Sequence, residues 1–221
     1  MKLKTFTFLT IAVAALTACN KKDLVFPEDN DIASLNVYNL STTSLNVFLN
    51  GNRLNTVASI TPIGASGYMS VTPGAQTYQF KKSGTPDVLF TKALDLEVTK
   101  DYTLFVAGTS DANSFLVSDA FATDTSKTAR IRFVNASTDN AGNKVTLNTD
   151  TVVFNGIMFK TATEFVNIKP GKKLLTVSQA GSVAVSDSVT FVSGRVYTIF
   201  SKGTKTGTED AAYGAGIVAN N

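Results

Sequence analysis

One nine-residue segment occurs twice in this chain of 221 residues: ASLNVYNLS at 33–41 returns as ARIRFVNAS at 129–137. A shorter pair follows in the same order, with YTLF at 102–105 and YTIF at 197–200. A Pro-Gly pair also recurs between them, and the three offsets lie between 95 and 97 residues. Segments that recur in one order at a nearly fixed period indicate an internal duplication.

The pattern within each copy is that of short β-strands. Leu45, Val47 and Leu49 alternate with Asn46, Phe48 and Asn50, as expected of a strand with one aliphatic face. Asn50-Gly51 closes that run with a strong hairpin-turn signal. The 30 Thr and 22 Val residues favour strands over helices. Each copy is about 90 residues long, the size of an immunoglobulin domain. We therefore predict an all-β fold of two tandem immunoglobulin-like antiparallel β-sandwich domains, over residues 32–122 and 128–221.

Two tyrosines occupy corresponding places in the copies. Tyr102 and Tyr197 each open a strand after a turn-rich stretch, six residues downstream of Leu96 and Phe191 respectively. A tyrosine in this place resembles the tyrosine corner of β-sandwiches, whose hydroxyl bonds to upstream backbone. We expect both rings to be structural; the alternative is that they are platforms on which a ligand stacks.

Residues 1–18 have the pattern of a lipoprotein signal peptide, with two lysines followed by a short apolar run. That run is shorter than the ~20 residues that a transmembrane helix needs. The segment Leu16-Thr17-Ala18-Cys19 resembles a lipobox, and Cys19 is the only cysteine of the chain. We expect lipid attachment at Cys19, a polar tether over 19–31, and membrane association through the N-terminal lipid. The alternative is an ordinary secretory signal cleaved near Ala18.

The second copy resembles a bacterial family, the domain of unknown function 4397 (DUF4397). The resemblance rests on ARIRFVNAS at 129–137, the Pro170-Gly171 turn and VYTIF at 196–200; the first copy departs from it by lacking both arginines. It implies a secreted or surface lipoprotein with tandem domains and a role in cell adhesion. It carries over no catalytic residue.

The absence of histidine excludes Ser-His-Asp and Cys-His catalysis and every His-ligated metal site. Paired carboxylates remain, and Asp95 with Glu97 would share one face of a strand. The second copy has no counterpart of that pair, so a carboxylate-based hydrolase is the less favoured alternative. Loop oxygens at Asp139-Asn140 and Glu209-Asp210 form no recognisable calcium loop. We therefore expect no catalytic residue, no metal and no cofactor.

Positive charge is unevenly distributed. The second copy holds ten Lys and Arg residues against six acidic ones, and the first holds five against six. Arg130, Arg132, Lys172 and Lys173 are the candidate binding residues for a protein or anionic glycan, with ordinary solubilising charge as the alternative. No nucleic-acid motif is present.

These patterns together predict a non-enzymatic lipoprotein of a cell envelope that acts as a binding or adhesion module. The expected location is the outer membrane of a Gram-negative bacterium, on its periplasmic side or at the cell surface. The main alternative is a structural or assembly partner of other outer-membrane proteins, for which a free sheet edge would be the sign.

Overall fold

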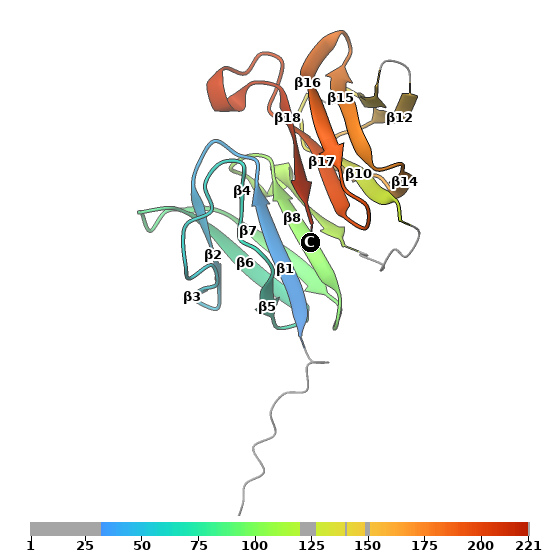
Figure 1. The fold of residues 1–221 in the computed structure, drawn as a ribbon. Coiled ribbons are helices and arrows are strands. Elements are labelled where there is room, and N and C mark those ends of the chain that lie inside the picture. The colour runs from blue at the N-terminus through green and yellow to red at the C-terminus, as the bar shows by residue number, and fades with distance from the viewer. Residues whose placement is uncertain (1–31, 120–126, 140, 149–150, 221) are drawn as a thin grey trace, which may run out of the picture.

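A computed structural model describes residues 32–119, 127–139, 141–148 and 151–220, which form two β-sandwiches in contact with each other (Figure 1). The strands of the first are β1 (Ala33–Asn39), β2 (Leu45–Leu49), β3 (Asn52–Arg53), β4 (Gly64–Ala65), β5 (Met69–Val71), β6 (Gly74–Lys82), β7 (Val88–Leu96), β8 (Asp101–Val106) and β9 (Ser114–Ser118). Those of the second are β10 (Ala129–Asn135), β11 (Asn143–Leu147), β12 (Thr151–Ile157), β13 (Thr161–Ala162), β14 (Val166–Ile168), β15 (Gly171–Gln179), β16 (Ser182–Phe191), β17 (Val196–Lys202) and β18 (Gly214–Ala219).

Each sandwich is built from two sheets with the same strand order. In the first, β3-β2-β6-β7 faces β4-β1-β8-β9, and β5 also pairs with β1. In the second, β12-β11-β15-β16 faces β13-β10-β17-β18, and β14 also pairs with β10. The predicted all-β fold of two tandem sandwiches is therefore confirmed. The predicted signal peptide, Cys19 and the tether lie outside the described residues.

Local sequence accounts for the hairpin that opens the first sandwich. Asn50 and Gly51 have φ values of 50° and 81°, the left-handed conformation that a tight turn between β2 and β3 requires. A second turn of this kind, at Ala180 and Gly181, joins β15 to β16. Turns with two positive φ values match the twist of the strands that they join.

One strand pair in each sandwich is parallel. Strand β1 runs parallel to β8, with Leu35 opposite Tyr102, and β10 runs parallel to β17, with Ile131 opposite Tyr197. A parallel neighbour requires a crossover, and the chain between β1 and β8 passes through the opposite sheet. The matching registers place the repeated segments at equivalent positions of the two sandwiches.

Each sandwich has its own apolar core between its sheets. The core of the first includes Leu35, Val37, Val47, Phe80, Leu96 and Leu104. The core of the second includes Ile131, Phe133, Val145, Val177, Phe191 and Ile199. A third buried cluster, which joins the two sandwiches, contains Tyr38, Leu40, Phe105, Phe115, Val134, Ala136 and Phe200. The central strands therefore bury both of their faces. No helix in the described part of the chain could cross a membrane.

Candidate functional site

The two sandwiches meet through the outer faces of their sheets that contain the parallel strand pairs. Along β1, Leu35 and Val37 face the first core, whereas Tyr38 belongs to the cluster between the sandwiches. The ring of Tyr38 lies 5.1 Å from that of Phe200 across the contact, measured between ring centroids. Phe105 stacks on Phe115 at 5.5 Å. Aromatic pairs at these separations contribute favourably beyond the area that they bury.

A buried ion pair lies at one end of this contact. Arg132 of β10 donates from Nη2 to the Asp119 carboxylate, which directly follows β9, and both side chains are almost fully buried. Arg132 also donates from Nε to Thr198 Oγ1 at 2.9 Å. The other carboxylate oxygen of Asp119 accepts the hydroxyls of Thr103 at 2.6 Å and Tyr68 at 2.7 Å. Asp119 is thus bonded to both sandwiches, and together with the buried cluster it joins them.

The strand registers identify the counterparts of this pair in the other copy. Arg132 lies opposite Thr198 on β17, as Asn36 lies opposite Thr103 on β8. The N–H of Asp119 bonds to the carbonyl of Asp101, and the N–H of Asn220 bonds in the same way to that of Val196. The sandwiches therefore present the same face to each other, but Asn36 and Asn220 stand where the ion pair would have its duplicate.

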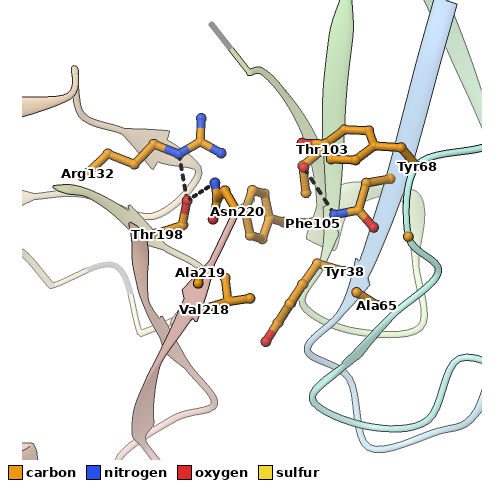
Figure 2. A pocket seen from close by; sticks show the side chains of 12 residues that line it. Tyr38, Ala65, Tyr68, Thr103, Phe105, Arg132, Thr198, Val218, Ala219 and Asn220 are labelled. Carbon is orange, nitrogen blue, oxygen red and sulfur yellow. Dashed lines mark hydrogen bonds between the residues drawn. The ribbon is translucent and has the colours of Figure 1, made fainter. Parts of the chain in front are cut away.

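A cleft of about 190 Å³ opens beside these two asparagines. Figure 2 shows Tyr38, Tyr68 and Phe105 of the first sandwich on one side, and Arg132, Thr198 and Asn220 of the second on the other. The remaining lining residues are Asn36, Ala65, Gly67, Thr103, Val218 and Ala219. Of these described lining residues, only Arg132 is charged, and Asp119 neutralises it.

The hydroxyls of the cleft tyrosines remain protonated at neutral pH. Burial raises the pKa of Tyr38. The pKa of Tyr68 is raised above its ordinary value of 10.0, mainly by burial and secondly by the negative charge of Asp119. Tyr68 as a whole is 43% exposed, and its hydroxyl is held by Asp119.

The four basic residues suggested by the sequence do not form one site, although two of them, Arg130 and Arg132, lie side by side. Arg132 is only 2% exposed, so its charge is not presented on an open surface as the sequence suggested. Arg130 lies beside it, and both guanidinium groups stack on the Phe165 ring at about 5 Å. Lys172 and Lys173 lie on β15, in the other sheet of the second sandwich.

Tyr102 and Tyr197 lie in the cores of their sandwiches, each 7% exposed. The Tyr102 hydroxyl accepts the backbone N–H of Glu97 at 3.3 Å, and the Tyr197 hydroxyl accepts that of Val192 at 2.9 Å. Each hydroxyl therefore bonds to the chain five residues upstream. The cleft tyrosines, Tyr38 and Tyr68, are different residues.

The carboxylates considered for catalysis lie away from the cleft. Asp95 is exposed on β7, an outer strand of the opposite sheet. Glu97 is also exposed, and its carboxylate pairs with Lys100 at 2.6 Å. Asp139 accepts the backbone N–H of Lys205 at 2.7 Å. Within the described residues, no three Asp, Glu, Cys or His side chains gather as a metal site would require.

Sequence reasoning did not single out Asn36, Tyr38, Tyr68 or Asn220. A signal for the interface was present, because Tyr38 and Phe105 are apolar residues on the strand face opposite the core. The copies differ at two equivalent positions of this contact. The ion pair is made by Arg132 and Asp119, and their counterparts in the other copy, Asn36 and Asn220, line the cleft. The second difference becomes visible only when the strands are paired, because β18 is offset from β9 by a longer intervening loop.

Several solved structures resemble this chain weakly. The C-terminal domain of AlgF from P. aeruginosa is 21% identical with a TM-score of 0.32, over 42% of this chain and 99% of that one. The Bacillus anthracis TIE protein is 11% identical with a TM-score of 0.26, over 79% and 34%. The family 26 carbohydrate-binding module CBMbc of Eubacterium rectale Amy13K, solved with maltoheptaose, is 11% identical with a TM-score of 0.25, over 85% and 97%. Likenesses this distant do not bear on function.

No curated protein sequence matches the chain. One protein family matches it twice, over residues 33–143 and 129–215, and these two matches cover most of the chain. The first matched segment covers the first sandwich and runs on through β10 to the start of β11, and the second covers the second sandwich as far as the start of β18. The two sandwiches share one strand order. The chain therefore belongs to the family described as domain of unknown function DUF4397, and it carries two tandem copies of that domain.

Proposed function

We propose that this protein is a non-enzymatic, lipid-anchored binding or adhesion module of a bacterial cell envelope, and that the cleft between its sandwiches is the binding site. The observation that carries the proposal is the construction of the cleft. A buried ion pair and an aromatic cluster hold two domains in one orientation, and aromatic rings and amides line the space left between them. Pockets with apolar walls and a few convergent polar groups are typical of ligand sites.

The cleft chemistry favours binding over catalysis. Arg132, the one charged residue among its described lining residues, is bonded to Asp119, Thr198 and the Ser118 carbonyl. Asp119 in turn is occupied by three donors. A general acid or base must reach the proton that it transfers. The Arg132 guanidinium and the Asp119 carboxylate are hydrogen-bonded to each other and are not available to transfer a proton to a ligand, so the cleft is better suited to binding than to catalysis.

The anchor completes the proposal. Lipid on Cys19 would hold the N-terminus at the outer membrane, and the tether over residues 19–31 would separate the sandwiches from the bilayer. More than one acyl chain gives a stable anchor, because each buried CH₂ contributes ~0.8 kcal/mol. We expect Cys19→Ser to move the chain from the membrane fraction to the soluble fraction of cells. A variant that stays in the membrane fraction would show that the anchor is elsewhere.

Binding can be tested with a variant that fills the cleft. Ala65 is an exposed lining residue, so Ala65→Trp should occupy the cleft without disturbing either core. Ala93→Trp is the matched control, because Ala93 is exposed on β7 in the opposite sheet of the same sandwich. Liposomes carrying the full chain would be applied to arrays of glycans and of envelope proteins. We expect binding that Ala65→Trp abolishes and Ala93→Trp preserves.

Other outcomes separate the alternatives. Binding that survives Ala65→Trp would remove the cleft from the proposal. Binding that is instead lost on Val183→Lys would favour the structural or assembly role, because Val183 is exposed on β16, the outer strand of its sheet. Hydrolysis of an arrayed glycan that stops on Asp95→Asn would favour the carboxylate-based hydrolase.

A further inference from the structure

The cleft is the place where a duplicated contact is incomplete. On one side of the contact, Arg132 and Asp119 join the sandwiches directly. Their counterparts Asn36 and Asn220 both line the cleft. Asn36 has a much shorter side chain than Arg132, and neither asparagine carries a charge, so no ion pair closes the space on this side. Asn36 and Asn220 thus lie at backbone positions equivalent to those that hold the ion pair, and the space between them could hold a ligand.

The two amides are positioned by their own strands. Asn36 donates from Nδ2 to Thr103 Oγ1 at 3.3 Å. Asn220 donates from Nδ2 to Thr198 Oγ1 at 2.8 Å (Figure 2). Each –NH₂ group has a second N–H. The Oδ1 of Asn220 accepts no hydrogen bond from the described residues. The amides therefore offer donors and an acceptor, the combination that pairs with hydroxyl groups, since a hydroxyl both donates and accepts.

The rest of the cleft is apolar and aromatic. Tyr38 and Phe105 are almost fully buried and held by the interface cluster, whereas Tyr68 is partly open to solvent. Val218 of β18 contributes an aliphatic wall. A sugar ring has C–H groups on its faces and hydroxyls on its edge, so it presents both kinds of surface that this cleft matches.

The charge and the volume of the cleft restrict the class of ligand further. The Arg132 guanidinium is neutralised by Asp119, so an anionic ligand would have to compete with a buried carboxylate that is already bonded. The cleft, at about 190 Å³, is smaller than the ~300–1,000 Å³ of sites for drug-sized ligands. It therefore accommodates one ring, such as the end of a chain, and disfavours a charged ring.

We infer that the cleft binds a single neutral sugar ring, with its hydroxyls bonded to Asn36 and Asn220 and its apolar face against the apolar wall of the cleft, to which Tyr68 and Val218 contribute. This inference rests on the proposed binding function and adds the ligand class. A site that hydrogen-bonds hydroxyl groups discriminates strongly against ligands that lack them, because its polar groups are then left unpaired.

The test uses the full chain in detergent, neutral hexoses, and the matching uronic acids, which differ in one carboxylate. The cleft variant is Asn36→Arg with Asn220→Asp, which reproduces the Arg132–Asp119 pair at the equivalent positions and so should fold while closing the cleft. The control is Asn52→Arg with Asn155→Asp, the same charge changes at exposed sites on β3 and β12. Calorimetry measures affinity, and NMR follows the side-chain amides of Asn36 and Asn220.

We expect at least one neutral hexose to bind the wild type and the control alike. Closing the cleft should weaken that binding at least about tenfold, the effect of losing about 1.4 kcal/mol of hydrogen bonding. The uronic acid should bind at least about tenfold more weakly than its neutral parent.

Equal or tighter binding of uronic acids would overturn the neutral-sugar inference and leave the proposed function standing. So would a failure of every sugar to bind while Ala65→Trp still abolishes array binding. If no sugar binds and Ala65→Trp does not reduce array binding, both the neutral-sugar inference and the assignment of the cleft as the binding site are wrong.

Discussion

Replacing Asp119 by asparagine keeps the shape of the side chain but removes the negative charge that faces Arg132. The Arg132 side chain is only 3% exposed, so water cannot solvate the charge that is left. Breaking a buried ion pair from one side costs about 3–5 kcal/mol, because the remaining charge stays buried and uncompensated. We therefore expect Asp119→Asn to lower the free energy of unfolding by about that amount. Arg132→Met should be similarly harmful, since it strands the buried carboxylate.

The double variant separates the ion pair from the packing around it. With both charges absent, no uncompensated charge remains, and the loss should be smaller than the sum of the single losses by at least about 2 kcal/mol. Urea unfolding followed by far-ultraviolet circular dichroism measures all four proteins, since the chain has no tryptophan to report by fluorescence.

An exposed pair provides the control. Glu97 and Lys100 are 2.6 Å apart but 68% and 49% exposed, so Glu97→Gln and Lys100→Met should each leave the free energy of unfolding almost unchanged. Losses below about 1 kcal/mol for both Asp119→Asn and Arg132→Met, additive in the double variant, would refute the idea that this pair holds the sandwiches together.

Three further predictions concern the individual sandwiches and the cleft. Tyr197→Ala should destabilise the second sandwich by about 3–5 kcal/mol in thermal unfolding, because a buried ring is lost. Tyr197→Phe should cost only about 1 kcal/mol, for the hydrogen bond to Val192. A Tyr197→Ala variant that melts at the wild-type temperature would revive the ligand-platform alternative. Asn135→Ala should cost about 2 kcal/mol or more, because this fully buried amide bonds to the Ile157 carbonyl and the Ser137 N–H, and a smaller loss in urea would mean that water replaces it. The pKa of Tyr68 is raised in the folded chain, so its contribution to the free energy of unfolding is complete below pH 10 and declines as the pH rises further. Tyr68→Phe should therefore make the loss of stability at alkaline pH shallower. An unchanged dependence of stability on pH would contradict the role of Asp119 beside it.

The duplication, the all-β fold and much of the strand pattern follow from local sequence. Alternating side chains over residues 45–49 and the Asn50-Gly51 turn are near-neighbour features, and a hairpin closes within a few residues of them. The repeated segments identify equivalent positions without any knowledge of packing, as the registers of Tyr102 and Tyr197 show.

The contact between the sandwiches could not be predicted in this way. A charged residue in a strand is ordinarily solvated, so the sequence alone gives no reason to expect that Arg132 is buried. It is buried because Asp119 and Thr198, 13 and 66 positions away, meet it where two sheets pack outer face to outer face. The cleft has the same origin, since Asn36 and Asn220 are 184 positions apart and become a pair only through the parallel strands and the packing of one copy on the other. Periodicity records which residues share a face of a strand, but what covers that face depends on long-range packing, which no local pattern contains.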